Sequence, residues 1–361
     1  MPFFPDTVYR ARRAAMQDEL AASGVSGLVV GTGAEFEYLT GSAVRSHERL
    51  TALVLGPGTA RVVAPLTDVA SLEADAALDG VEVVGWRDGE DPYALVAEVL
   101  GQGTVEVTAG VTANHLFALG EHLPEIALAA PDVFAVKDDA EVAELAAAAA
   151  AIDRVHARVP KLLQTGRTEA DIAAELTRLI EFEHARANFV IVGSGPNGAN
   201  PHHSYSDRLL GPGDPVVVDI GGTTASGYHS DCTRTYVVAG ATPDPAFTRA
   251  YEVLRDAQEA AVATARPGMT AGELDAVARD AIEAAGYGEH FTHRLGHGIG
   301  LAIHEAPFII AGSDVALEAG MVFSIEPGIY VPGAWGMRIE DIVHLTAAGA
   351  VRLNRCERSW Q

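Results

Sequence analysis

The sequence predicts an α/β protein of two domains, on three observations. Its 361 residues are enough for two domains, and 48% hydrophobic with 20% charged residues is typical of a globular protein with a full core. Helical and strand-like segments alternate over residues 1–135, and the composition changes at Lys137, where an alanine-rich segment begins. We therefore expect a smaller N-terminal α/β domain over 1–135 and a larger domain over 136–361.

The first domain is predicted from short alternating elements. Residues 6–23 have an amphipathic helical pattern that Asp6 opens, and GLVVG (27–31) is a short strand. TALVLGPGTARVVAP (51–65) has two apolar runs around a Gly-Pro-Gly turn, which predicts a hairpin. The region holds no cluster of catalytic residue types, so the functional chemistry is expected further along the chain.

The second domain is predicted to open with one long helix over residues 138–164 and to contain two similar halves. GRTEADIAAELTRLIE (166–181) and GMTAGELDAVARDAIE (268–283) align at an offset of 102 residues. In each, Gly-x-Thr is followed by an acidic residue, which predicts helix N-caps at Thr168 and Thr270. A duplicated α/β half and two ordinary capped helices both explain this pattern.

Charge and composition exclude several classes of partner. The formal net charge of −24 argues against nucleic acids and anionic membrane surfaces as partners. With only Cys232 and Cys356, the chain offers no disulfide framework, which fits a reducing compartment. The chain has no apolar run of 18 residues, and its start lacks the long apolar segment of a secretory signal. We expect a cytoplasmic protein.

The stretch VVVDIGGTTASGYHSDCTRTYVV (216–238) places two carboxylates in apolar strands joined by a turn. With the turn centred on Ala225, Asp219 would lie directly opposite Asp231, with Cβ atoms about 5 Å apart. Two ionised carboxylates that close repel each other in poorly solvated surroundings. The hairpin therefore requires either a shared proton or a bound cation.

A second hairpin decides between these two possibilities. In MVFSIEPGIYVPGAWGMRIEDIVHL (321–345), a turn at Gly333 places Glu326 opposite Glu340. Two facing carboxylate pairs favour two divalent cations over shared protons. Seven of the 13 histidines lie between residues 202 and 304, three of them in HRLGHGIGLAIHEAP (293–307). Four carboxylates and one imidazole suit Mn²⁺, Co²⁺, Zn²⁺ or Fe²⁺ better than Mg²⁺.

The order of these residues resembles a known family. Asp, Asp, His, Glu and Glu occur in that order, in VVVDIG, SDCTRTY, GHGIGLAIHE, SIEPGIY and MRIED; the residues are Asp219, Asp231, His297, Glu326 and Glu340. The pattern resembles the pita-bread metallopeptidases, which include methionine aminopeptidase, Xaa-Pro aminopeptidase and Xaa-Pro dipeptidase. The resemblance covers roughly residues 137–361 and implies a pita-bread catalytic domain. The smaller N-terminal α/β domain is similar to the creatinase-like domain of the Xaa-Pro branch.

The resemblance implies a role for each residue. Asp219 would hold one ion, His297 and Glu326 the other, and Asp231 and Glu340 would bridge two ions (Mn, Co or Zn, with Fe possible) that activate water for hydrolysis. The remaining implied site residues are His202 near the scissile carbonyl and leaving group, with His203 as the alternative; His304, which steadies the tetrahedral intermediate; His293 on the substrate side; Arg338, which orients the bridging region; and Glu326 again, as proton shuttle.

The resemblance also implies a small peptide substrate with proline at position 2, and a homodimer in which the N-terminal domain reaches the partner's site. Some Xaa-Pro dipeptidases have an arginine shortly after the histidine that matches His304, whereas this chain has Phe308 there. No Lys or Arg lies between Leu295 and Met337. We therefore expect an Xaa-Pro aminopeptidase acting on longer peptides, with a strict Xaa-Pro dipeptidase as the alternative.

Three competing readings are weaker. VIVGSGPNG (190–198) contains the G-x-G-x-x-G pattern of dinucleotide-binding proteins, but prolines at 201 and 212 exclude the helix that should follow. A non-catalytic peptide-binding protein or a metal-free C–N hydrolase on the same fold would be expected to lack some of the five metal ligands.

The spacing of the two aspartates differs from the family. Asp219 and Asp231 are 12 residues apart, one more than the usual family spacing, and we place the extra residue in the turn over 221–227.

Overall fold

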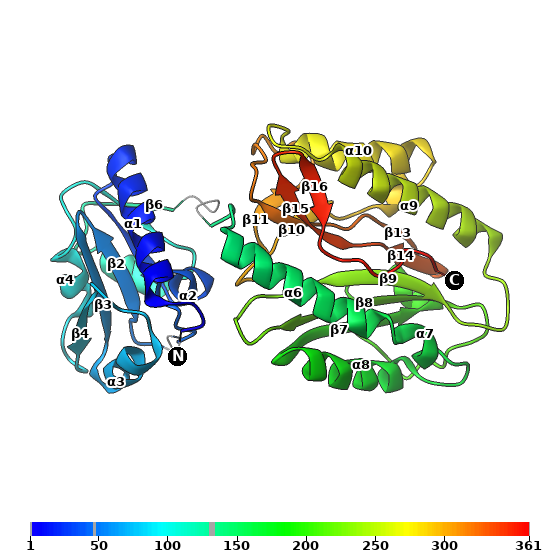
Figure 1. Ribbon diagram of the computed structural model, residues 1–361, viewed down its shortest axis with the longest axis horizontal. Coiled ribbons are helices and arrows are strands. Elements are labelled where there is room, and N and C mark those ends of the chain that lie inside the picture. Colours follow the sequence, from blue (N-terminus) through cyan, green and yellow to red (C-terminus); the bar gives the residue numbers. More distant parts are fainter. Residues whose placement is uncertain (1, 46–47, 130–133, 361) are drawn as a thin grey trace. The chain divides into compact units, whose positions relative to one another are not determined.

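The computed structural model describes residues 2–45, 48–129 and 134–360. It divides into two compact units, Met1–Phe134 and Ala135–Gln361 (Figure 1). Within the described residues, none of the helices combines the length and the apolar character that crossing a membrane requires.

The N-terminal unit is built on a six-stranded mixed sheet of order β4-β3-β2-β1-β5-β6. Its elements are α1 (Asp6–Ser23), β1 (Gly27–Gly31), α2 (Ala34–Thr40), β2 (Ala52–Gly56), β3 (Thr59–Pro65), α3 (Leu66–Asp75), β4 (Glu82–Trp86), α4 (Pro92–Ala97), β5 (Thr104–Val107), α5 (Ala113–Leu119) and β6 (Glu125–Leu128). The predicted helix over 6–23, the strand over 27–31 and the hairpin within 51–65 are confirmed.

The first half of the C-terminal unit has its own apolar core, formed mainly by α6, α8, β7, β8 and β9. Its elements are α6 (Asp139–His156), α7 (Val159–Leu162), α8 (Glu169–Glu183), β7 (Arg186–Ser194), η1 (Gly195–Ala199), β8 (Pro215–Thr223) and β9 (Cys232–Val237). The single long helix expected over 138–164 is wrong, because the chain forms two helices there. Pro160, in the first turn of α7, has no N–H to continue the hydrogen-bond ladder of α6.

The second half forms the other core of this unit, around α9, α10 and the remaining strands. Its elements are α9 (Pro245–Thr264), α10 (Ala271–Ala284), η2 (Gly288–His290), β10 (Gly296–Gly298), β11 (Glu305–Ile309), β12 (Val322–Ile325), β13 (Gly328–Val331), β14 (Trp335–Arg338), β15 (Asp341–Thr346) and β16 (Gly349–Arg352). Figure 1 shows the strands of both halves lying between α9 and α10 on one side and α6 and α8 on the other.

The two halves start in the same way. Thr168 caps α8 and Thr270 caps α10, each in a capping box. The next residue of each helix also makes an equivalent backbone hydrogen bond, from Glu169 N to Arg208 O and from Ala271 N to Val315 O. This equivalence favours a duplicated half over two unrelated capped helices.

The register of the second predicted hairpin is confirmed. Gly328 pairs with Arg338 in β13 and β14, and Ile325 pairs with Asp341 in β12 and β15. Gly333 lies at the turn with φ of 74°, a backbone conformation that glycine adopts without steric cost. The same register therefore places Glu326 and Glu340 opposite each other, between the two strand pairs.

The register of the first hairpin differs from the expectation. Asp219 pairs with Thr233 and not with Asp231, because β8 continues to Thr223 and the turn centres one residue later than Ala225. Since 231 and 233 have the same parity, Asp231 still lies on the Asp219 face, as a diagonal neighbour. The long turn thus keeps both carboxylates on one side of the sheet despite the unusual spacing.

Candidate metal centre

Four acidic side chains and one histidine from different strands gather at the centre of the C-terminal unit. Asp219 lies in β8, Asp231 directly before β9, His297 in β10, Glu326 directly after β12 and Glu340 between β14 and β15. Their oxygen and nitrogen atoms form overlapping groups in which all candidate ligand atoms lie within 4.8 Å of one another: Asp219, Asp231 and Glu340; His297, Glu326 and Glu340; and Asp231, His297 and His304. The structure therefore brings together all five residues expected to bind metal.

Two oxygens of this cluster are buried without a hydrogen-bond partner among the described residues. They are Asp219 Oδ1 and Glu340 Oε1. Their companion oxygens are bonded, Asp219 Oδ2 to Arg338 and Glu340 Oε2 to the hydroxyl of Thr233 at 2.8 Å. A buried polar atom left without a partner costs free energy, so these oxygens fit ligation of a cation. The chemistry of the donor set fits divalent ions with oxygen and nitrogen ligands.

The ionisation of the cluster also fits a cation. Burial, reinforced by neighbouring carboxylates, raises the pKa of both Asp231 and Glu340 well above the usual range. Burial acts in the same direction on Glu326, but the interaction with His297, whose Nε2 lies 3.2 Å from Oε1, outweighs it and lowers the pKa of Glu326 to about 2. A divalent ion would supply the positive charge that this crowded group of carboxylates requires.

His297 is oriented by its own strand. Its backbone N–H donates to the Ser324 hydroxyl at 2.9 Å, and its Nδ1 faces the Gly298 carbonyl at 3.1 Å. Because a carbonyl only accepts, Nδ1 carries the proton, and Nε2 points to the carboxylates, 3.2 Å from Glu326 Oε1 and 3.8 Å from Asp231 Oδ2. This is the arrangement of a histidine that ligates metal through Nε2.

Arg338 and His293 are linked by Tyr330, which was not singled out from the sequence. Arg338 donates from Nη1 to the Tyr330 hydroxyl at 2.7 Å, and this hydroxyl lies 3.0 Å from His293 Nε2. His293 Nδ1 lies 2.7 Å from the Arg294 carbonyl, so Nε2 accepts from Tyr330. Burial lowers the pKa of His293, which favours this neutral form. The alternation of Tyr330 with Gly328 on β13 could have identified it from the sequence.

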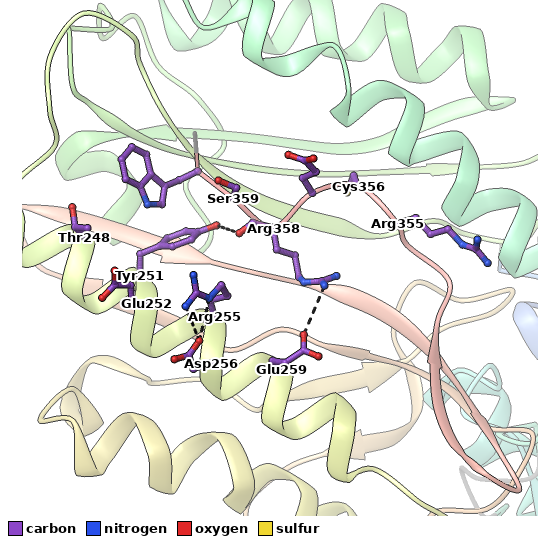
Figure 2. Close-up of a pocket in the computed structure, with 12 residues that line it drawn as sticks. Thr248, Tyr251, Glu252, Arg255, Asp256, Glu259, Arg355, Cys356, Arg358 and Ser359 are labelled. Atoms are coloured by element: carbon purple, nitrogen blue, oxygen red, sulfur yellow. Dashed lines mark hydrogen bonds and ion pairs between the residues drawn. The ribbon is translucent and has the colours of Figure 1, made fainter.

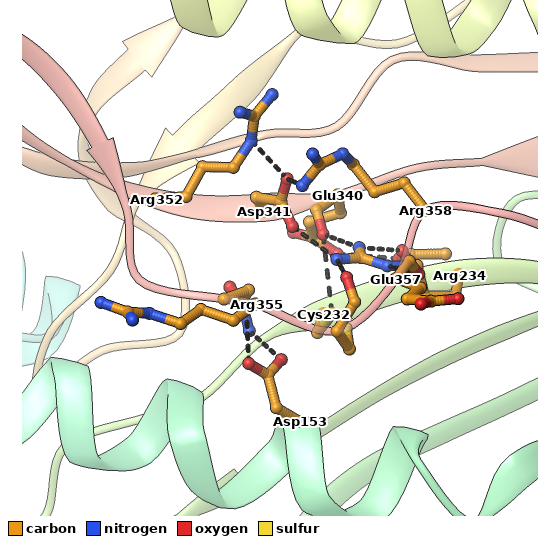
Figure 3. Close-up of polar contacts among 12 residues, drawn as sticks. Asp153, Cys232, Arg234, Glu340, Asp341, Arg352, Arg355, Glu357 and Arg358 are labelled. Atoms are coloured by element: carbon orange, nitrogen blue, oxygen red, sulfur yellow. Dashed lines mark hydrogen bonds and ion pairs between the residues drawn. The ribbon is translucent and has the colours of Figure 1, made fainter.

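The backbone of Glu340 is held by the fully buried guanidinium of Arg234 (Figure 3). Arg234 Nη1 donates to the Glu340 carbonyl at 2.5 Å, and Nη2 donates to Asp341 Oδ1 at 2.6 Å. The same side chain also bonds the carbonyls of Cys356 and Glu357. Arg234 thereby links the C-terminal segment to the backbone of the candidate ligand Glu340.

Cys232 directly follows the candidate ligand Asp231, but its thiol contacts the Glu340 carbonyl and Cys356. Its side chain is fully buried, and its Sγ lies 3.7 Å from Cys356 Sγ; both thiols are free. The groove that Cys356 helps to line runs between α9 and the C-terminal segment (Figure 2). None of the five candidate metal ligands lines this groove, so it is a separate surface feature.

The two adjacent histidines after η1 differ in their surroundings. His203 Nε2 lies 2.8 Å from a carboxylate oxygen of Glu169, whereas the His202 ring is exposed. Burial, followed by the charges of His297 and Arg294, lowers the pKa of His304 to about 4. Because Glu169 engages the ring of His203, His202 is the histidine of this pair whose ring is left available to a substrate.

Arg294 is a further residue that was missed from the sequence. Its guanidinium carbon lies 4.7 Å from the ring centroid of Phe308 because β10 pairs with β11, with His297 opposite Phe308. The structure gives Arg294 no ion pair or hydrogen bond from its guanidinium within residues 2–45, 48–129 and 134–360. Arg294 directly precedes the stretch from Leu295 to Met337 that lacks Lys and Arg, and only the pairing of β10 with β11 shows that its guanidinium lies at Phe308.

Comparison with known proteins agrees with this architecture. Residues 143–347 match Metallopeptidase family M24, and residues 12–145 match the Creatinase/Prolidase N-terminal domain. A protein named "Probable dipeptidase PepE" from Mycobacterium bovis is 51% identical, over 98% of this chain and 96% of its own length. A protein named "Xaa-Pro dipeptidase" from Lactobacillus delbrueckii subsp. lactis is 37% identical, over 92% of this chain and 94% of its own length.

Solved structures extend the similarity to both units. The crystal structure of dipeptidase PepE from Mycobacterium ulcerans has a TM-score of 0.95 and 50% identity, covering 99% of this chain and 98% of that chain. A prolidase from Thermococcus sibiricus has a TM-score of 0.87 and 36% identity, covering 97% and 98%. The predicted pita-bread catalytic domain with a creatinase-like N-terminal domain is confirmed. The chain belongs to metallopeptidase family M24.

Proposed function

We propose that this metallopeptidase uses two divalent ions to hydrolyse the bond between the two residues of Xaa-Pro dipeptides. Asp219 and Asp231 would hold one ion, His297 and Glu326 the other, with Asp231 and Glu340 shared between them. The overlapping ligand groups and the two unpartnered carboxylate oxygens support this assignment. When bound, the ions would act as Lewis acids and lower the pKa of water. Mn²⁺, Co²⁺, Zn²⁺ and Fe²⁺ all suit this donor set.

The chain's own residues would then handle substrate and protons. Glu326 has a low pKa and accepts a hydrogen bond from the Ser324 hydroxyl, so it is ionised at neutral pH, the form in which a proton shuttle begins its cycle. Neutral His304 and the exposed His202 would donate hydrogen bonds to the scissile carbonyl as charge develops on its oxygen. His293, fixed by Tyr330, would lie on the substrate side.

The observation that favours dipeptides is the position of Arg294. A dipeptidase must recognise the carboxylate of the proline residue, and a guanidinium is well suited to bind it with two hydrogen bonds. Arg294 is half-buried, has no carboxylate partner in the described structure and stacks on Phe308, whose other face could pack on the proline ring. The names of the relatives, which include "Xaa-Pro dipeptidase", support the same choice. Arg294 thus supplies beside Phe308 the cation whose absence after Leu295 favoured an aminopeptidase.

We propose a homodimer in which the N-terminal unit of one chain approaches the site of its partner. This part of the proposal rests on the family resemblance. Sedimentation of the active protein tests it, because a fully active monomer would refute it.

The proposed function is tested with the purified chain loaded with Mn²⁺. We expect about two ions per chain by elemental analysis, hydrolysis of Ala-Pro, and much slower hydrolysis of Ala-Ala. Removal of the ions by a chelator should abolish the activity, and adding Mn²⁺ back should restore it. Full activity in a metal-free sample would refute the proposal.

A further inference from the structure

Glu169, the first residue of α8, has a fully buried carboxylate that belongs to neither the metal cluster nor the implied catalytic residues. Among the residues that the structure describes, it accepts hydrogen bonds only from one short segment, residues 194–206. The donors are Ser194 N at 2.7 Å, Ser194 Oγ at 2.6 Å, Asn197 Nδ2 at 3.1 Å, His203 Nε2 at 2.8 Å, Ser206 N at 2.9 Å and Ser206 Oγ at 2.7 Å. One carboxylate thus fixes both ends and the middle of this segment.

The carboxylate is charged despite its burial. Burial alone would raise the pKa of Glu169, but the hydrogen bonds from Ser194, His203 and Ser206 outweigh it and lower the pKa. Such charge-assisted hydrogen bonds are about twice as strong as neutral ones. The segment is therefore held by an anchor that a neutral side chain of the same shape cannot replace, since an amide nitrogen would face donors instead of accepting from them.

The segment held by Glu169 carries His202. His202 directly precedes His203, whose ring donates to Glu169, and its backbone N–H donates to Asn200 Oδ1 at 3.1 Å. The His202 ring itself is exposed, and no described residue forms a hydrogen bond with it. Its position therefore depends on the backbone, and Glu169 fixes the backbone on both sides of it.

In the second half of the unit, a different buried carboxylate holds the segment that carries a candidate histidine. Ala271, which corresponds to Glu169, cannot accept a side-chain hydrogen bond. Instead Asp275 on α10 is fully buried and accepts from Leu295 N at 3.0 Å, while its ion-pair partner Arg279 donates to the His293 carbonyl at 2.9 Å. Each half thus ties its histidine-bearing segment to its own helix through a buried carboxylate.

We propose that Glu169 is the positioning residue of His202, holding it where it can act on the scissile carbonyl. This inference rests on the proposed function for its catalytic part, but its structural part does not. Loss of the Glu169 charge would let the segment that carries His202 move without altering the metal ligands. A displacement of about 1 Å is enough to lower kcat by roughly 100-fold.

The test is a double-mutant cycle between Glu169→Gln and His202→Ala in the Mn²⁺-loaded enzyme. We expect Glu169→Gln to lower kcat roughly 10- to 100-fold, with KM and metal content little changed. In the His202→Ala background the same substitution should lower kcat less than about threefold, because the residue it positions is gone. Equal losses of kcat in both backgrounds would overturn the proposal.

Asp171→Asn is the matched control. Asp171 lies on the same turn of α8, but its side chain bonds the backbone N–H of Thr168 and not the segment over 194–206. We expect this variant to lower thermal stability through the lost cap while leaving kcat within about twofold of the wild type. A fall in kcat as large as that of Glu169→Gln would show that any weakening of α8 suffices, which would overturn the positioning role.

Amide hydrogen exchange separates this inference from the proposed function. Exchange in residues 194–206 should become faster in Glu169→Gln and stay unchanged in Asp171→Asn, whether or not the protein hydrolyses Xaa-Pro dipeptides. Where Glu169→Gln does not fold, Ser206→Ala removes one donor and should give a smaller change of the same kind. Unchanged exchange in a folded variant would overturn the inference even if the proposed function holds.

Discussion

Arg338 donates a hydrogen bond of 2.5 Å to Asp219 Oδ2, while Oδ1 of the same carboxylate has no partner among the described residues. One protein cation thus compensates one oxygen at the edge of a cluster of four acidic side chains. Arg338 is itself fixed by Tyr330 and by the Thr233 hydroxyl, at 3.0 Å. Arg338 thus engages one oxygen of Asp219 and leaves Oδ1 open to the metal ion that this carboxylate is proposed to bind.

Replacing this guanidinium should therefore affect the metal-free protein most. Arg338→Met leaves buried Asp219 without its partner, which costs about 3–5 kcal/mol in buried pairs. Bound Mn²⁺ would replace part of the lost positive charge, so we expect a larger fall in melting temperature with chelator than with saturating Mn²⁺. Arg338→Lys, which keeps the charge, is the control. Equal falls in both conditions would contradict the assignment of Asp219 as a ligand.

Substitution of bridging ligands and of the catalytic histidine should differ in kind. Asp231→Ala and Glu340→Ala would each remove a carboxylate that we propose to be shared by both ions, so we expect loss of bound metal and of detectable turnover. His304→Ala should retain its metal and lose roughly 10²- to 10³-fold in kcat, as expected for one donor to the developing oxyanion. Elemental analysis reports the bound metal of each variant, and steady-state kinetics report its kcat. Comparable residual rates in all three variants would argue against the bridging roles.

Close backbone packing beside His297 predicts a strong effect at Gly296. A Cβ atom at Gly296 would overlap the carbonyl oxygen of Ser324, so β10 would have to move away from β12. We expect Gly296→Ala to lower the free energy of unfolding by about 1–3 kcal/mol or more and to weaken metal binding. Gly211→Ala is the control, since its Cβ would come no closer than 3.5 Å to its neighbours. Urea unfolding measures the free energy of unfolding of both variants. Equal values for Gly296→Ala and Gly211→Ala would contradict the prediction.

His156 predicts a pH dependence of stability. Burial, followed by the charge of Arg234, lowers the pKa of His156 to about 3. Between this value and an unfolded pKa of about 6.5, the unfolded chain binds a proton that the folded chain does not. The free energy of unfolding should therefore fall as the pH falls through this window, by up to about 1.4 kcal/mol per pH unit.

The contribution of His156 is isolated with His156→Gln. Measured by urea unfolding with chelator present, so that acid release of metal plays no part, the variant should lose less stability than the wild type between pH 6.5 and pH 4. Parallel curves for the two proteins would show that His156 titrates normally in the folded state.

Much of the site could be predicted because it depends on local patterns. Apolar strands interrupted by Asp219, Asp231, Glu326 and Glu340 indicate buried carboxylates, and a symmetric turn at Gly333 is enough to give the correct register. The first register could not be obtained in this way, because the length of a long turn decides where pairing begins. The break at Pro160 was readable from the sequence, since proline cannot continue a helix.

The rest of the site depends on contacts between distant segments. Arg294 reaches Phe308 through strand pairing, and Glu169 reaches His203 from 34 residues away. Neither contact has a periodic signal in the sequence. The contact between Glu169 and His203 decides between His202 and His203 as the candidate catalytic residue. The contact between Arg294 and Phe308 supports the proposed substrate class.

The most direct test of the account compares Ala-Pro with its amide, Ala-Pro-NH₂, and with Ala-Pro-Ala in the Mn²⁺-loaded enzyme. The first two differ only in the carboxylate that Arg294 is proposed to bind. We predict a kcat/KM for Ala-Pro roughly 100-fold higher than for the other two, and a ratio near one in Arg294→Met, with turnover of the amide retained. Equal or faster cleavage of the amide and the tripeptide by the wild type would contradict the dipeptidase assignment and favour an Xaa-Pro aminopeptidase.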